Sequence, residues 1–150
     1  MSDNKQWYAD LVLPVLLHEA RRTYGRAIRA ALTAEGFDDM PRLGPRLLGG
    51  MHRFGGQPTD LAGDFGISKQ AASKLVDALV VRGYLDRSVD PDDRRRMLLS
   101  LTERGEAAAK ATSSASDRID RELDQTVGAD AVAQMRETLG TLVGLGERAG

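Results

Sequence analysis

The chain has 150 residues, which is enough for one domain with a hydrophobic core and short for two. Its formal net charge of −1 argues against a protein that coats nucleic acid with its whole surface. The absence of cysteine excludes disulfides, thiolate metal sites and cysteine-based redox sensing. The sequence has neither an apolar run of about 18 residues nor an N-terminal signal pattern, so we expect a soluble, cytoplasmic protein.

Apolar and small residues alternate steps of three and four from about Gln6 to Ala34, after five polar residues that we expect to be frayed. This pattern predicts a long helix, bent near Pro14, with a heptad-like seam: Leu13, Leu17, Ala20, Tyr24, Ala27, Ala31 and Ala34. A second copy of the chain is the natural cover for so long a seam. The alternative is that the helix packs across its own domain.

Two shorter helices should follow a loop at residues 35–42. We expect the first at Leu43–Phe54. The second should run from Pro58, a residue suited to the first helical position, to Phe65, with Gln57 where a Ser or Thr cap is expected.

The next helix is the clearest in the sequence. Ser68 is a good N-cap, and Gly83 can end the helix in left-handed geometry. A buried face is predicted at Ala72, Leu75, Val76 and Leu79, and the opposite face carries Lys69, Gln70, Ser73, Lys74 and Asp77.

Two apolar segments then predict a β-hairpin, Tyr84–Val89 and Met97–Leu101, joined by the turn-prone and basic run Asp90–Arg96. A helix with a polar tip, followed by a hairpin with an arginine-rich tip, is typical of a winged helix-turn-helix. That fold places the helix in a DNA major groove and the wing at the adjacent minor groove.

Two helices complete the chain. The first should run from its cap Thr102 to about Thr126, with one face made of Ala108, Ala111, Ala115, Ile119 and Leu123. After a break at Gly128, the last helix repeats the pattern at Val132, Met135, Leu139 and Leu142. Residues 68–96 hold seven Lys or Arg against five Asp or Glu, whereas residues 103–150 hold six against nine. This distribution suits a protein that contacts DNA through a small basic region, residues 68–96, and is acidic on the side away from the DNA.

Several motifs together resemble the MarR family of bacterial repressors. They are Gly66-Ile67-Ser68, Leu79, Gly83-Tyr84-Leu85-x-Arg87 and Asp93-x-Arg95-x-x-x-Leu99-x-Leu101-Thr102-x-x-Gly105. The resemblance implies a mainly α fold with a small β-hairpin wing, in one domain of residues 1–150. A winged helix-turn-helix at 43–102 would be flanked by dimerisation helices at 1–34 and 103–150.

The candidate DNA contacts are Ser68, Lys69, Gln70, Ser73 and Lys74 on the helix and Asp93, Arg94, Arg95 and Arg96 on the wing. Gln70 suits adenine edges, and the lysines suit guanine edges or phosphates. By its match to the family, Arg95 is expected to enter the minor groove, positioned by a salt bridge from Asp93. Arg94 and Arg96 should meet phosphates.

The resemblance also implies a small aromatic acid as effector. Its candidate liners are His18, Arg22, Arg46, Met51 and His52, for each of which ordinary interface packing is the alternative. The function expected is that of a homodimeric repressor on an inverted repeat of double-stranded DNA, without enzymatic activity, cofactor or metal. The alternatives are an architectural or effector-independent DNA-binding dimer, or a small enzyme using His18 or His52.

Overall fold

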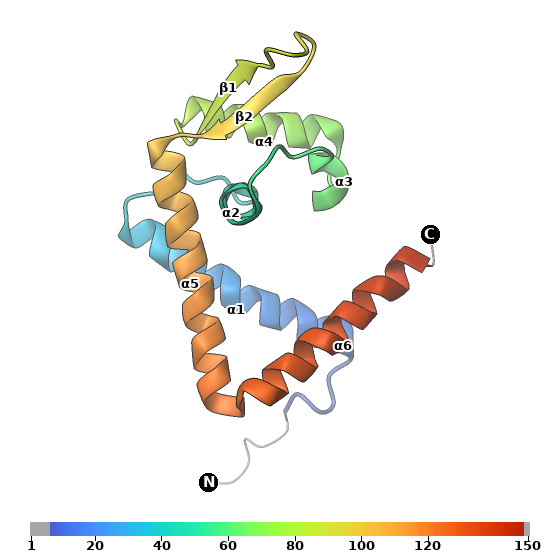
Figure 1. The fold of residues 1–150 in the computed structure, drawn as a ribbon. Coiled ribbons are helices and arrows are strands. Elements are labelled where there is room, and N and C mark those ends of the chain that lie inside the picture. The colour runs from blue at the N-terminus through green and yellow to red at the C-terminus, as the bar shows by residue number, and fades with distance from the viewer. Residues whose placement is uncertain (1–6, 149–150) are drawn as a thin grey trace. The chain divides into compact units, whose positions relative to one another are not determined.

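The computed structural model describes residues 7–148, which form six helices and one two-stranded antiparallel sheet (Figure 1). The chain divides into two compact units, Met1–Ala115 and Ser116–Gly150. The elements are α1 (Leu13–Ala34), α2 (Gly44–Phe54), α3 (Leu61–Phe65), α4 (Lys69–Val81), β1 (Leu85–Val89), β2 (Met97–Leu101), α5 (Glu103–Val127) and α6 (Ala129–Arg148). This is the predicted mainly helical fold with a hairpin wing. The five N-terminal residues expected to be frayed, and Gln6, lie outside the described residues.

Helix α1 begins later than predicted and buries a different face. Pro14 lies in its first turn, where a missing N–H costs nothing, so it starts the helix rather than bending it. The buried residue of α1 is Leu32, and Ile28, one turn earlier, packs beside it against the core. The predicted seam, which a second copy was expected to cover, omitted both residues, and its members Leu13, Ala20 and Ala34 are exposed in the single chain.

The helix-turn-helix is formed by α3 and α4. Helix α3 starts at Leu61 rather than Pro58, because the side chain of Asp60 caps it by accepting the N–H of Gly63 at 3.0 Å. Gln57 is therefore not a cap. The predicted cap of α4 is confirmed, since Ser68 Oγ accepts the N–H of Ala71 at 3.1 Å. Gly83 ends the helix with a φ of +75°.

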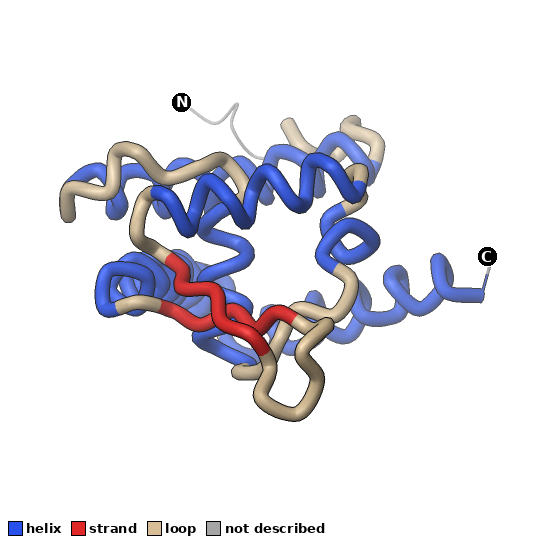
Figure 2. The backbone as a smooth tube through the Cα atoms, turned by 90° about the horizontal axis from the view of Figure 1, so that it is seen from above, coloured by secondary structure: helices blue, strands red, loops and turns tan. Residues whose placement is uncertain are grey.

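The wing strands pair antiparallel with Leu85 opposite Leu101 and Val89 opposite Met97. They begin and end within a residue of the prediction. Leu85 is buried, and the rest of β1 is exposed. Strand β1 contacts α4, and β2 contacts α2. The loop that joins the strands stands out from the hairpin (Figure 2).

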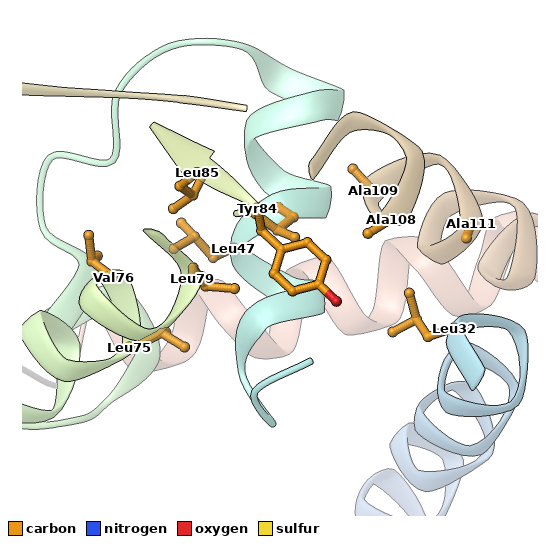
Figure 3. Close-up of a cluster of buried hydrophobic side chains, with 11 residues drawn as sticks. Leu32, Leu47, Leu75, Val76, Leu79, Tyr84, Leu85, Ala108, Ala109 and Ala111 are labelled. Carbon is orange, nitrogen blue, oxygen red and sulfur yellow. The ribbon is translucent and has the colours of Figure 1, made fainter. Parts of the chain in front are cut away.

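One hydrophobic core holds the first unit together (Figure 3). The predicted face of α4 is buried in full, together with Leu47 and Leu48 of α2. Helix α5 adds small buried residues, namely Gly105, Ala108, Ala109, Ala111, Thr112 and Ala115. Small side chains let α5 approach α2 closely: a Cβ on Gly49 would lie 3.6 Å from Thr112 Cγ2. Tyr84 is fully buried among these elements.

In the second unit, Arg136 of α6 donates to Asp120 of α5 at 3.2 Å. Ile119 and Leu123 of the predicted α5 face are half-buried there. On α6, Val132 is buried, whereas Met135 and Leu142 are exposed by 42% and 40%. None of the helices within residues 7–148 has the length and apolarity that spanning a membrane requires.

A polar cluster not predicted from the sequence closes the base of the wing. The Tyr84 hydroxyl donates to Asp39 Oδ1 at 2.5 Å, and Arg104 Nη2 donates to the same oxygen at 2.8 Å. Arg104 also lies over the Tyr84 ring, with its Cζ 4.6 Å from the ring centroid. Arg82 donates to the Asp39 carbonyl oxygen at 2.6 Å. The loop before α2, the end of α4, the start of the wing and the start of α5 are thus tied at one point.

The cluster shifts the titration of its members. The hydrogen bond from Tyr84 and the charge of Arg104 lower the pKa of Asp39. Burial, and then the hydrogen bond to Asp39, raise the pKa of Tyr84. At neutral pH the cluster therefore holds a carboxylate, a neutral phenol and a guanidinium.

Replacing Gly105 by Ala should destabilise the protein. An added Cβ would lie 2.0 Å from the Tyr84 carbonyl oxygen, a backbone atom that cannot move aside alone. We expect a loss of about 1–3 kcal/mol in the free energy of unfolding, measured by urea denaturation at fixed protein concentration. Gly50→Ala is the control, because its Cβ would meet no atom within 4 Å and alanine favours the helix by roughly 0.5–1 kcal/mol. Equal stability of the two variants would contradict the close approach.

Replacing Tyr84 by Phe should change how much the free energy of unfolding falls at acid pH, which is the acid limb of the stability curve. Because the pKa of Asp39 is lowered in the folded state, its contribution to stability is present above about pH 4 and is lost as the pH falls through the folded-state pKa. Removing the hydroxyl raises that pKa towards its ordinary value, so less stability should be lost at acid pH. Unfolding measured from pH 2 to pH 6 tests this expectation. In an Asp39→Asn background, the same Tyr84→Phe change should leave the acid limb unaltered.

Candidate nucleic-acid interface

Four residues of the polar face of α4 are exposed and have no partner within the described chain. Lys69, Gln70, Ser73 and Lys74 are all exposed, and within residues 7–148 none of their side chains forms a hydrogen bond or ion pair. Ser68 is also exposed, but its hydroxyl oxygen is engaged as the helix cap. The buried face of the same helix fixes its orientation, so these groups are presented on a rigid support. They are available to an external hydrogen-bonding partner.

The wing tip is folded by its aspartates. The Asp90 carboxylate accepts the N–H of Asp92 at 2.9 Å, and the Asp93 carboxylate accepts the N–H of Arg95 at 3.0 Å. Such aspartate side chains stabilise tight turns. Asp93 does position Arg95, but through the backbone N–H rather than through the salt bridge that the sequence suggested.

The three consecutive arginines have different surroundings. Arg96 Nε lies 4.0 Å from Asp90 Oδ2, so a neighbouring carboxylate partly neutralises it. Arg94 and Arg95 are exposed and have no ion-pair partner within the described part of the chain. These two guanidinium groups are the free cations of the wing tip.

An ion pair links the wing to α4. Arg87 Nη2 of β1 lies 2.7 Å from Asp77 Oδ1 of α4. Both side chains are exposed, so the pair adds little to stability, but it links the strand to the helix. A hollow of about 450 Å³ lies beside it, with Lys69, Ser73, Arg87 and Met97 among its lining residues. The helix and the wing therefore frame a common concave surface.

The five candidate effector residues do not come together. Arg46 and Met51 line a second cavity, of about 260 Å³, with Phe54, Leu61 and Phe65 among its other walls. Arg46 donates to the Asp64 carbonyl oxygen at 2.7 Å and lies 4.3 Å from the centre of the Phe65 ring. This places a cation beside an apolar wall.

The other three candidates, His18, Arg22 and His52, do not line that cavity. Arg22 pairs with Glu19 at 3.1 Å, and His52 Nδ1 lies 2.7 Å from Glu106 Oε2. His18 is exposed. Within residues 7–148, no group of three or more His, Asp or Glu side chains is placed to hold a metal ion.

The chain resembles proteins of known structure along most of its length. A crystal structure of MepR of S. aureus with DNA covers 90% of this chain and 98% of its own, at 20% identity and a TM-score of 0.72. The apo form of MarR from E. coli covers 88% and 96%, at 23% identity and a TM-score of 0.62. The transcriptional regulator Tm0710 from Thermotoga maritima covers 90% and 94%, at 24% identity and a TM-score of 0.56. At these identities the likeness establishes the shared fold. A comparison with curated proteins finds no match.

Sequence comparison adds the family. The MarR family model matches residues 38–96, a range that contains α2, α3, α4, β1 and the wing tip. This range also holds every candidate DNA-contacting residue. The helix-turn-helix and wing of this chain therefore match the MarR family, and most of the chain shares the fold of the solved structures named above.

Proposed function

We propose that the protein is a homodimeric repressor that binds an inverted repeat in double-stranded DNA and is released by a small aromatic acid. One observation carries the DNA-binding part of this proposal. Four polar residues of α4 without an internal partner and two unpaired wing arginines lie on elements that the Arg87–Asp77 ion pair joins. The MepR structure, which contains DNA, supports this use of the fold.

In the proposed complex, α4 enters the major groove and the wing tip reaches the adjacent minor groove. Gln70 reads an adenine edge, and Lys69 and Lys74 contact guanine edges or phosphates. Arg95 inserts into the minor groove, where the narrow walls concentrate negative potential. Arg94 contacts a phosphate, and Arg96 does so once it moves away from Asp90.

A dimer fits the geometry of B-DNA, because the proposed inverted repeat presents two half-sites about 34–36 Å apart on one face. Each unit of the chain offers apolar surface that a partner can cover. In the first unit, Val12 and Leu13 are exposed by 66% and 54%. In the second, Val143 and Leu145 are exposed by 66% and 54%. Exposed apolar groups of this size on terminal helices support dimerisation through residues 1–34 and 103–150.

The cavity beside Arg46 supports the effector part of the proposal. An aromatic carboxylate has a ring that can pack on Met51, Leu61 and Phe65, and a charge that Arg46 can bind. Its occupation would act on α2 and α3, next to the DNA-contacting helix. A ligand changes DNA affinity only by as much as it prefers one arrangement over the other, typically 1–3 kcal/mol.

Replacing Arg95 by Ala should weaken binding to the cognate operator by roughly 1–3 kcal/mol without affecting folding, because the side chain is exposed and has no internal partner. The operator is first located by footprinting the DNA upstream of the protein's own gene. Fluorescence anisotropy at fixed salt then gives the affinities for that operator and for random DNA. Arg42→Ala, in the loop before α2, is the control, since it removes the same charge from an exposed position outside the proposed DNA contacts and dimerisation helices.

Two further results of this experiment bear on the proposal. Sedimentation of the complex should show two chains per inverted repeat. Equal affinity for operator and random DNA at one salt concentration would instead indicate an architectural protein. Unchanged operator affinity of the Arg95→Ala variant would transfer the minor-groove role to Arg94 or Arg96.

A salicylate-like acid should lower operator affinity five-fold or more, on the coupling scale given above. A panel of aromatic acids, titrated into the protein–operator complex at fixed pH and salt, measures the effect. Gly50→Leu is the matched variant, because Gly50 lines the cavity and its added side chain would project into open space. Loss of the response in this variant places the acid in the cavity, and an equal response excludes that location.

A further inference from the structure

The side chain of Gln57 forms two hydrogen bonds with the backbone of the wing. Its Nε2 donates to the Leu99 carbonyl oxygen at 2.7 Å, and its Oε1 accepts the Leu99 N–H at 2.7 Å. A side-chain amide that pairs with both backbone groups of one residue reproduces the pattern of a neighbouring β-strand. The contact joins residues separated by 42 positions in the sequence.

Leu99 lies where a third strand would join the sheet. Leu99 is opposite Arg87, and backbone hydrogen bonds join Thr102 to Tyr84 and Asp90 to Arg96. In an antiparallel pair, bonded and non-bonded positions alternate, so the N–H and C=O of Leu99 point away from β1. They lie on the outer edge of β2, and Gln57 satisfies both of them.

The loop that carries Gln57 has no comparable backbone link to the wing. Within the described chain, residues 56–59 make no backbone–backbone hydrogen bond in the loop between α2 and α3. Pro58, the next residue, cannot donate one. The side chain of Gln57 therefore supplies the directional contact between this loop and β2.

We propose that Gln57 is a positioning residue that acts as a one-residue third strand and sets the angle of the wing, and thereby the placement of Arg95 on DNA. The inference rests on the proposed function, because the placement of Arg95 matters only when DNA is bound. Two hydrogen bonds spaced along one edge resist tilting of the hairpin's long axis relative to the loop, which a single bond does not. The hairpin tip lies several residues beyond Leu99, so a small rotation at the edge becomes a larger displacement of the tip.

The proposal has a consequence that a merely stabilising contact lacks. If Gln57 places the wing, then removing Gln57 should remove part of what Arg95 contributes, and the two substitutions should be non-additive in DNA binding. If the contact only stabilises the fold, Arg95→Ala should weaken DNA binding by the same factor with and without the Gln57 side chain.

The experiment uses the full chain, the operator located by footprinting, and Gln57→Met, which has a similar length and makes no such hydrogen bonds. We expect operator affinity to fall five- to ten-fold. Arg95→Ala should then weaken binding at least three-fold less in the Gln57→Met background than in the parent. Gln57→Glu, which retains the acceptor for the Leu99 N–H, should lie between the parent and Gln57→Met. Thr59→Val is the control, because Thr59 lies in the same loop and makes no hydrogen bond in the described chain.

Hydrogen exchange of the Leu99 amide in the free protein tests the contact without DNA. Gln57→Met should accelerate this exchange at least ten-fold, with the amides of α4 unchanged. Equal exchange rates, or an Arg95→Ala factor that is the same in both backgrounds, would overturn the inference. Absence of specific DNA binding by the parent protein would instead overturn the proposed function, and the two failures are therefore distinguishable.

Discussion

The backbone at Tyr84 is the constraint on which the rest of the first unit depends. Its carbonyl oxygen accepts the N–H of Thr102 at 3.2 Å, and Gly105 fits beneath it only because glycine has no Cβ. The Thr102 hydroxyl donates to the Gly83 carbonyl oxygen at 2.5 Å and accepts the N–H of Gly105 at 2.9 Å. One threonine thus caps α5 and also holds the end of α4. The hairpin begins and ends at this junction. The hydrogen bonds of Thr102 therefore determine where the base of the wing lies relative to α4.

The junction explains why a small number of weak polar contacts can orient the wing. Exposed ion pairs such as Arg87–Asp77 contribute little stability when they must also order their side chains. Here the strands are already ordered by the buried Tyr84 and Leu85 at their base. The pair, together with Gln57, acts on a hairpin that retains few degrees of freedom. Each contact can therefore specify an angle at small cost.

The sequence predicted most features that are periodic or local, and it missed polar contacts between residues far apart in the chain. The buried face of α4, the Ser68 cap and both wing strands were predictable from periodicity and turn chemistry. The predicted start of α3 was wrong. Proline suits the first helical position, which favoured Pro58, but the side chain of Asp60 caps the helix and it starts at Leu61. Leu32 was missed because the small residues beside it fitted a heptad equally well. The Asp39–Arg104 and Gln57–Leu99 contacts join residues 65 and 42 positions apart, and single polar residues leave no periodic signal. Arg46 and Met51 line one cavity, but no local rule could separate them from His18 and Arg22.

Contacts within the wing loop explain how a wing without net positive charge can suit DNA. The loop contains Asp90, Asp92 and Asp93, and a net charge of −1 offers no general attraction to phosphate. However, the carboxylates of Asp90 and Asp93 accept backbone N–H groups within the loop, and Asp90 also lies near Arg96. These carboxylates therefore point into the turn that they stabilise, while Arg94 and Arg95 remain exposed without an internal partner. Two arginines without an internal partner in the described chain therefore stand against one such aspartate, Asp92, so the outward charge is net positive although the loop as a whole is neutral. Such a tip attracts DNA only at close range. This favours binding in one fixed position on the DNA over non-specific binding along the duplex.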